Sequence, residues 1–174
     1  MAEARPAPDV RLRRWTDADL PILVASNSPE MTRMLGGPES SAQVRRRHER
    51  YLRGWDVGNP RMFSAVSTDG RPLGSVGWWE STFDDRDVYE LGWVVLPAQQ
   101  GRGVASAMAR LAVDDALGHG DGRDLMACPP VENAASNGVC RAAGFTLAAT
   151  RPEEFRGVQL TLNFWVRSGA ASGS

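Results

Sequence analysis

The sequence has few of the residues that build metal sites and disulfide frameworks. Its 174 residues include two cysteines, Cys128 and Cys140, and two histidines. One cysteine pair makes no disulfide framework, and the cysteines and histidines do not follow a metal-binding spacing. We therefore expect no metal in this protein.

The sequence also lacks an excess of charge and a long apolar run. Twenty basic residues against 21 acidic ones give a formal net charge of −1, whereas nucleic-acid-binding proteins usually carry a basic excess. No apolar run approaches the ~20 residues of a membrane span, and the start MAEARPAPD does not read as a signal peptide. We expect a cytoplasmic protein with no nucleic-acid or membrane partner. The one basic stretch fits the solvated face of a helix: Arg45, Arg46, Arg47, Arg50 and Arg53.

What is present is the composition of an ordinary globular domain. Hydrophobic residues make up 42 % and charged residues 24 % of the chain, which is typical of a soluble protein. The length is sufficient for one domain with a substantial core. We expect a single domain over residues 9–167, with flexible termini at 1–8 and 168–174.

Turn signals and apolar periodicity predict a mixed α/β order. Asp69-Gly70 is the strongest hairpin signal, and the polar segments 82–87 and 151–157 are predicted as turns. Together the elements predict one sheet with helices on its faces. The predicted strands cover 10–15, 61–68, 73–81, 88–96, 124–128, 145–150 and 158–166, and the predicted helices cover 18–26, 28–36, 40–58, 104–118 and 133–144.

Two glycines stand where the strand 88–96 gives way to an alanine-rich helix, in QQGRGVASAMARL. Gly101 and Gly103 let the backbone turn sharply and let a ligand approach it closely. Unpaired N–H groups and the positive dipole end favour an anion at a helix start. Glycines at such a turn can also serve close packing alone, so both explanations remain open from the residues.

Two common phosphate-binding patterns do not fit this turn. A dinucleotide fingerprint needs glycine or alanine where Ser106 stands, and its second strand ends in an acid. Here Asp124 begins its strand instead. A P-loop needs Gly-Lys followed by Ser or Thr, and the sequence contains no such triplet.

The pattern Gln100-x-x-Gly103-x-Ala105 resembles the coenzyme A signature of the GCN5-related N-acetyltransferases (GNATs). The preceding segment ELGWVVLPA resembles that family's central strand. A second segment, PPVENAASNGVCRAAGF, resembles the N-x-x-S-x-x-V-x-x-x-x-G-F motif of the subgroup that acetylates the N-termini of ribosomal proteins. The residues that match this motif are Asn133, Ser136, Val139, Gly144 and Phe145.

The resemblance, which covers about residues 9–167, implies a mostly antiparallel sheet with helices on both faces and a splay between strands 88–96 and 124–128. Acetyl-CoA is expected in this splay, with its pantetheine arm paired to strand 88–96. The backbone groups expected to hold the arm belong to Trp93, Val94 and Val95. The N–H groups expected to hold the pyrophosphate belong to Gln100, Gly101, Arg102, Gly103, Val104 and Ala105.

Two of these positions have alternative roles. The Arg102 side chain is placed either to add a charge-assisted contact to the cofactor or to remain in solvent. Asn133 either caps its helix or bonds the pantetheine arm.

The resemblance implies transfer of an acetyl group from acetyl-CoA to a primary amine in a ternary complex. Glu90 is the candidate general base, with Glu80 on the neighbouring strand as the second candidate. Ser136 is expected near the cofactor sulfur as proton donor. Cys140 stands where many members of the family carry a tyrosine, so it is the other candidate donor. A thiolate also leaves without an acid, because the thiol pKa is only ~8.5.

The acceptor is expected to be a protein N-terminus or a small-molecule amine. Two alternatives are a coenzyme A-binding protein without catalysis and an enzyme for a longer acyl chain. The resemblance also makes a homodimer possible. The candidate walls of the acceptor site are Trp55, Trp78, Trp79 and Phe155. Acidic residues either steer a cationic acceptor or are ordinary polar turns: Asp84, Asp85, Asp87, Glu153 and Glu154.

Overall fold

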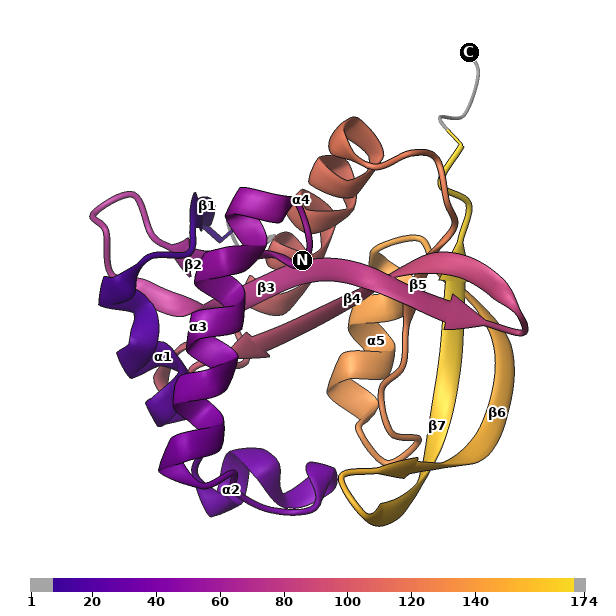
Figure 1. Ribbon diagram of the computed structural model, residues 1–174, viewed down its shortest axis with the longest axis horizontal. Coiled ribbons are helices and arrows are strands. Elements are labelled where there is room, and N and C mark those ends of the chain that lie inside the picture. The colour runs from indigo at the N-terminus through magenta and orange to yellow at the C-terminus, as the bar shows by residue number, and fades with distance from the viewer. Residues whose placement is uncertain (1–7, 171–174) are drawn as a thin grey trace, which may run out of the picture.

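A computed structural model of the chain describes residues 8–170 (Figure 1). Within that range the strands form one seven-stranded sheet of order β1-β2-β3-β4-β5-β7-β6. Only the β4–β5 pair is parallel, which confirms the predicted mixed, mostly antiparallel sheet. The expected flexible termini fall largely on residues 1–7 and 171–174, which lie outside the described residues. The strands are β1 (Arg11–Arg14), β2 (Arg61–Val66), β3 (Pro72–Phe83), β4 (Arg86–Val95), β5 (Leu125–Ala127), β6 (Thr146–Phe155) and β7 (Val158–Arg167).

The helices lie between the strands in the predicted order. None of those within residues 8–170 combines the length and the apolar character needed to cross a bilayer. The helices are α1 (Leu20–Ser26), α2 (Pro29–Thr32), α3 (Ser41–Val57), α4 (Val104–His119) and α5 (Ala134–Ala142), and the short 3₁₀ turns are η1 (Asp17–Asp19), η2 (Arg33–Leu35) and η3 (Pro97–Gln99).

Helix α3 has a local signal at each end. The hydroxyl of Ser40 accepts from the backbone N–H of Gln43 at 3.2 Å, and the Gln43 side chain accepts from the Ser40 N–H at 2.7 Å, which is a capping box. The helix ends at Gly58, whose φ of +82° is left-handed and suits glycine. Most of the arginines on this helix face solvent as predicted, namely Arg45, Arg46, Arg50 and Arg53.

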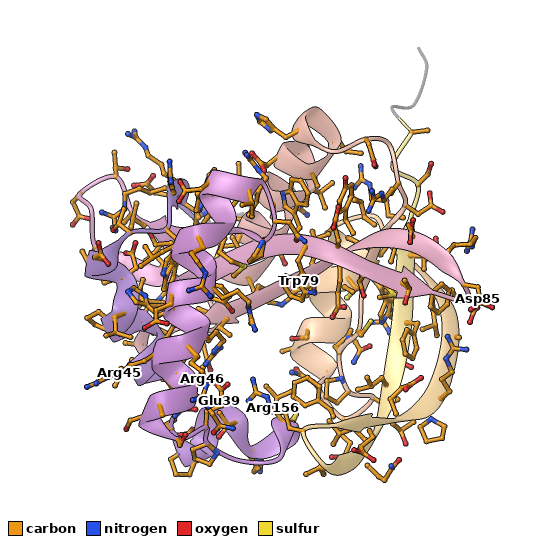
Figure 2. All side chains as sticks on the ribbon, viewed as in Figure 1. Glu39, Arg45, Arg46, Trp79, Asp85 and Arg156 are labelled. Carbon is orange, nitrogen blue, oxygen red and sulfur yellow. The ribbon has the colours of Figure 1, made fainter. Side chains whose placement is uncertain are left out.

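The connection between β3 and β4 is shorter than predicted. The segment 82–87 is not a six-residue turn, because both strands continue up to a two-residue turn at Asp84 and Asp85. These residues have φ values of +48° and +59°, the left-handed pair that a tight hairpin needs. Figure 2 shows Asp85 at this tip. The polar residues beside it belong to exposed ends of the strands, and that exposure made them resemble a loop.

The segment 151–157 is likewise mostly strand. β6 extends to Phe155, and only Arg156 and Gly157 form the turn to β7, with φ values of +50° and +77°. β6 lies at the edge of the sheet. An edge strand tolerates the proline and charged residues that made this segment look like a loop.

Alternating side chains divide the sheet into two differently covered faces. On one face, Trp78 and Leu91 pack in the largest apolar cluster with Met108 of α4 and with α5. On the other, Met62 packs with Val44 of α3 and with α1. Helices therefore cover both faces, as predicted.

Asp115 of α4 ties that helix to the sheet through its side chain. Its carboxylate accepts two hydrogen bonds from Arg61 of β2, at 2.9 and 2.8 Å, and one from the indole N–H of Trp78 at 2.8 Å. The Arg61 guanidinium also lies over the ring of Trp55, 4.6 Å from its centroid. This charge pair is mostly buried, with side chains 15 % and 18 % exposed.

Glu39 joins the β6–β7 turn to the segment before α3. Its carboxylate forms ion pairs with Arg47 of α3 and, at 3.3 Å, with Arg156 of the turn. Figure 2 shows Glu39 and Arg156 together at this end of the molecule. A Cβ added to Gly36 would lie 2.8 Å from a methyl carbon of Val158. The hairpin tip is therefore held at two points.

The Asp115 contacts predict a large stability loss on substitution. Asp115→Asn should lower the free energy of unfolding by about 2–4 kcal/mol, because the Arg61 charge would remain largely buried without its carboxylate. Urea unfolding measures this loss. Asp114→Asn is the matched control, since the neighbouring side chain is exposed and the same change should shift stability by less than about 0.5 kcal/mol. Equal effects of the two variants would contradict the assigned role of Asp115.

Candidate active site

The strands β4 and β5 pair over only two positions before they separate. Tyr89 lies beside Leu125 and Glu90 lies beside Met126, while all of β5 pairs with β7 on its other side. Beyond these positions β4 continues to Val95, and Figure 1 shows the two strands running apart. The predicted splay is therefore present, with Glu90 at its base.

The hydrogen-bonding direction of β4 decides which main-chain groups face this splay. The N–H of Leu96 donates to a β3 carbonyl at 2.9 Å, and directions alternate along an antiparallel strand. Val94 therefore turns its N–H and C=O toward β3, and the structure corrects the expectation that Val94 holds the cofactor. Trp93 and Val95 face the splay. The carbonyl of Val95 accepts from the side chain of Gln100 at 3.2 Å.

The glycine turn is left-handed and open. Gly101 and Gly103 have φ values of +72° and +77°, a conformation that costs other residues free energy. Within residues 8–170, a Cβ on Gly101 would meet no atom within 4 Å, and one on Gly103 would meet only Pro8, at 3.7 Å. Among these residues, no close contact explains the two glycines. The turn leads into Val104, the first residue of α4, and Arg102 beside it is exposed.

Glu90 presents a half-buried carboxyl on the α3 side of the sheet. It lies opposite Trp79 on β3 and accepts from the hydroxyl of Ser81 at 3.0 Å. Burial raises the pKa of Glu90, and hydrogen bonds with Ser81 and Trp79 offset part of that rise. Gly92 makes room for the indole, because a Cβ there would lie 2.7 Å from the Trp79 ring. Figure 2 shows Trp79 between α3 and α5 in this view.

Glu80 does not share this site. It lies opposite Tyr89, so its side chain projects from the other face of the sheet. There it pairs with Arg123 at 3.4 Å and accepts from the amide of Asn59 at 3.2 Å. The structure therefore corrects the expectation that Glu80 is a second candidate base.

The two candidate proton donors differ in access. Ser136 of α5 is half-buried, and its backbone N–H donates to the side chain of Asn133 at 3.0 Å. Asn133 therefore caps α5, while a bond from it to the cofactor stays a prediction. Cys140 is 0 % exposed within the core, and burial raises the pKa of its thiol to about 12. Cys140 is thus a packing residue, which corrects its candidacy as an acid.

Of the four aromatic candidates, two are structural. Trp78 bonds Asp115 on the α4 face, and the indole N–H of Trp55 donates to a β2 carbonyl at 2.8 Å. Trp79 lies on the Glu90 face. Phe155 lies at the end of β6, opposite Val158, so these two aromatics stay candidates for the acceptor site.

Sequence reasoning missed Asn137, which is 4 % exposed and fixes α5 against β7. Its amide nitrogen donates to the carbonyls of Pro130 and Asn133, and its amide oxygen accepts from the side chains of Asn163 and Trp165, all at 2.8–2.9 Å. The available signal in the sequence was its position four residues after Asn133, the N-cap of α5. Its buried partners come from a strand far along the chain, which the motif did not reveal.

Within residues 8–170, no group of three or more His, Cys, Asp or Glu side chains is placed to hold a metal ion.

Comparisons with known proteins agree on a family. A family model described as an acetyltransferase (GNAT) domain matches residues 9–146. No match was found among curated protein sequences.

Solved structures share the fold across nearly the whole chain. A putative acetyltransferase of Salmonella typhimurium, yncA, with its cofactor acetyl-CoA, is 22 % identical and has a TM-score of 0.76, over 95 % of this chain and 97 % of that one. The spermidine N-acetyltransferase of Vibrio cholerae with CoA and spermine is 20 % identical, with a TM-score of 0.77 over 92 % and 96 %. RimL, a ribosomal L7/L12 α-N-protein acetyltransferase with coenzyme A, is 18 % identical, with a TM-score of 0.76 over 95 % and 98 %.

The half-buried carboxyl of Glu90 predicts a pH dependence of stability. Its folded-state pKa lies above the ordinary 4.5, so the folded state holds the proton more tightly than the unfolded state. The stabilisation that the protonated Glu90 carboxyl gives the folded state is complete below about pH 4.5. It is lost as the pH rises through the folded-state pKa of Glu90. Glu90→Gln removes this loss of stability toward neutral pH, because glutamine has no carboxyl to ionise. It should be more stable than wild type at pH 7 and lose that advantage near pH 4, as urea unfolding at both pH values would show.

Ser81→Ala is the companion variant for that measurement. The Ser81 hydroxyl stabilises the charged form of Glu90, so its removal should deepen the loss of stability toward neutral pH. Identical pH profiles for wild type and Glu90→Gln would contradict a raised pKa at this position.

Proposed function

Since the chain belongs to the GNAT acetyltransferase family, we propose that it moves the acetyl group of acetyl-CoA to a primary amine by direct attack in a ternary complex. The observation that carries the proposal is the splay between β4 and β5. It joins three parts: an open glycine turn, an unpaired stretch of strand edge and a carboxyl with raised proton affinity.

The residues present suit the two polar parts of acetyl-CoA. The backbone from Gln100 to Ala105 leads into the start of α4, where diphosphate oxygens gain from the positive end of the helix dipole and from main-chain N–H donors. The open space over Gly101 and Gly103 leaves room for them. The amide-containing arm can pair with the edge of β4 at Trp93, as an added strand would. All three of the structural neighbours described above carry acetyl-CoA or CoA, which supports this assignment.

Glu90 would act as the base in this scheme. An amine acceptor is mostly protonated at neutral pH, because its pKa is about 7.7–8.0 for an α-amine and about 10.4 for a lysine side chain. Glu90 takes that proton directly or through a water, and its raised pKa suits this task. The freed nitrogen attacks the acetyl carbonyl and forms a C–N bond, and the C–S bond breaks. The second proton that the nitrogen then loses passes through the Ser136 hydroxyl to the departing thiolate.

The leaving thiolate needs no acid from the core. Ser136 is the donor we propose, since it is half-buried while Cys140 is fully enclosed. The acetylated amine and CoA are the products. The neighbours that act on spermidine and on a ribosomal protein support an amine acceptor, and they span both the small-molecule and the N-terminal alternatives.

Removing the proposed base should slow catalysis without weakening the binding of acetyl-CoA. Glu90→Gln should lower kcat by about 10²–10³-fold and leave the Kd for acetyl-CoA within about twofold, because the carboxyl acts on the amine. Release of free CoA thiol in the presence of a panel of primary amines measures the rate. The chain contains no lysine, so acetylation of its own lysines cannot contribute to the signal.

Glu80→Gln provides the matched control for that assay. It makes the same chemical change on the neighbouring strand but on the opposite face, and it should keep near wild-type kcat. Full activity of Glu90→Gln, or equal losses in both variants, would remove Glu90 from the base role.

The glycine turn predicts a separate effect on binding. Gly103→Ala should weaken acetyl-CoA binding by about tenfold or more, roughly 1.4 kcal/mol, because a side chain in a left-handed conformation distorts the start of α4. Titration calorimetry measures this change. Gly122→Ala is the control, since Gly122 has a φ of +89°, lies away from the first turn of α4, and a Cβ there would meet no atom of residues 8–170 within 4 Å.

Both alanine variants should cost about 1–2 kcal/mol of stability through the left-handed backbone. Only Gly103→Ala should affect acetyl-CoA. If both bind acetyl-CoA like wild type, the pyrophosphate does not lie at this turn.

A further inference from the structure

Two residues of the neighbouring strand β3 border the Glu90 carboxyl. Trp79 is the direct partner of Glu90 across the two strands. Ser81, two residues further along β3, reaches Glu90 diagonally, and its hydroxyl donates to the carboxylate at 3.0 Å. Side chains at opposite and diagonal positions of an antiparallel pair lie within contact distance on one face. The carboxyl therefore has both a hydroxyl and an indole beside it.

The Trp79 ring follows the same diagonal and ends over Gly92. A Cβ added to Gly92 would lie 2.7 and 3.3 Å from the Cη2 and Cζ3 atoms of that ring, and the shorter of these separations is one that a real Cβ does not reach. Gly92 is the first residue after Glu90 whose side chain would project from the α3 face. The indole thus takes the place of a β4 side chain, just beyond the point where β4 leaves β5.

The two adjacent tryptophans of β3 serve opposite faces of the sheet. Trp78 is 3 % exposed, and its indole N–H donates to Asp115 on the α4 face at 2.8 Å. Trp79 is half-buried on the α3 face. Burial raises the pKa of Glu90 most, and the hydrogen-bonding side chains of Ser81 and Trp79 act in the opposite direction. One residue type therefore has a carboxyl partner on each face.

Another titratable group faces Glu90 from the end of β5. Met126 lies beside Glu90, and Cys128 shares the face of Met126 two residues later. Burial raises the pKa of the Cys128 thiol most, and Glu90 raises it further. The thiol therefore keeps its proton over the pH range in which the Glu90 carboxyl titrates.

We propose that Trp79 is a positioning residue of this site: its ring confines the Glu90 carboxyl beside the Ser81 hydroxyl, and Gly92 lacks a side chain so that the ring can lie there. The inference rests on the proposed role of Glu90 as the base. A free glutamate side chain populates several rotamers, and only those that point to the amine serve proton transfer. Trp79 acts through Glu90 and does not itself touch the reacting atoms.

Trp79→Phe keeps an aromatic ring, removes the indole N–H and shortens the side chain. It should lower kcat by about tenfold and leave the Kd for acetyl-CoA within about twofold. The acid limb of the pH profile of kcat/KM should move up by about 0.5–1 pH unit, because the charged carboxylate loses a donor. A role in folding alone would not move that limb.

Trp78→Phe is the matched control. It makes the same change one residue away on the opposite face, where the indole bonds Asp115. It should lower stability toward urea and leave the acid limb in place. Equal limbs for wild type and Trp79→Phe, or equal shifts in the two variants, would overturn the inference and leave acetyl transfer intact.

Gly92→Ala tests the same contact from β4, and it serves as the second variant if Trp79→Phe does not fold. Its Cβ should displace the indole and move the acid limb in the same direction. In the Trp79→Phe background the alanine should lower kcat by less than about twofold, because the shorter phenylalanine has vacated the space. A full, additive loss there would contradict the assigned contact between Gly92 and Trp79.

A titration of Glu90 itself separates this inference from the proposed function. If wild type acetylates no amine, the proposed function fails, and the ¹³C NMR signal of the Glu90 carboxyl, identified by its loss in Glu90→Gln, still reports the contact. Its midpoint should rise in Trp79→Phe as the acid limb does and stay unchanged in Trp78→Phe. An unchanged midpoint in Trp79→Phe would overturn the inference whether or not the protein is active.

Discussion

The early separation of β4 from β5 is the constraint on which the rest of this structure depends. The two strands share only two paired positions, and β5 then follows β7. A strand edge without a partner leaves N–H and C=O groups that must be bonded elsewhere. One of them, the Val95 carbonyl, accepts from Gln100 of the following turn. The remainder of the edge is suited to an extended, amide-containing ligand, so the proposed cofactor site arises from an interrupted sheet.

Side chains alternate between the two faces of the sheet along each strand, and the carboxylates on the two faces have different environments. On the α4 face, Asp115 accepts hydrogen bonds from Arg61 and Trp78 in a mostly buried charge pair, and that pair fixes the helix whose first turn follows the glycines. On the α3 face, the partners of Glu90 among residues 8–170 are the Ser81 hydroxyl and the Trp79 indole, and no cation of that range pairs with it. An ion-paired carboxylate stabilises the fold, whereas a desolvated one keeps its affinity for a proton. The same residue type therefore serves structure on one face and is available for chemistry on the other.

The regions around the splay differ in how they are held. Helix α5 is fixed by the Asn137 amide, all of whose hydrogen bonds end on protein groups. The β6–β7 turn is held instead by Glu39 through two ion pairs. The Glu39–Arg47 pair is mostly buried, but the Arg156 side chain of the turn itself is 37 % exposed. Salt screens a partly exposed pair of this kind, so the turn depends on a weaker contact than α5 does. The side that we assign to the acceptor is tied more loosely.

The sequence by itself determined the element order, the capped helix α3 and the glycine turn, because each depends on steric rules acting within a few residues. Gly101 and Gly103 were identifiable as a special backbone, and the tertiary structure then showed open space in place of close packing. Register was beyond the sequence, because strands pair across long stretches of chain and a shift of one residue exchanges the faces. Register separated Glu90 from Glu80 and turned Val94 toward β3. Only the assembled core could show that Cys140 is enclosed, because burial depends on contacts from elements distant along the chain.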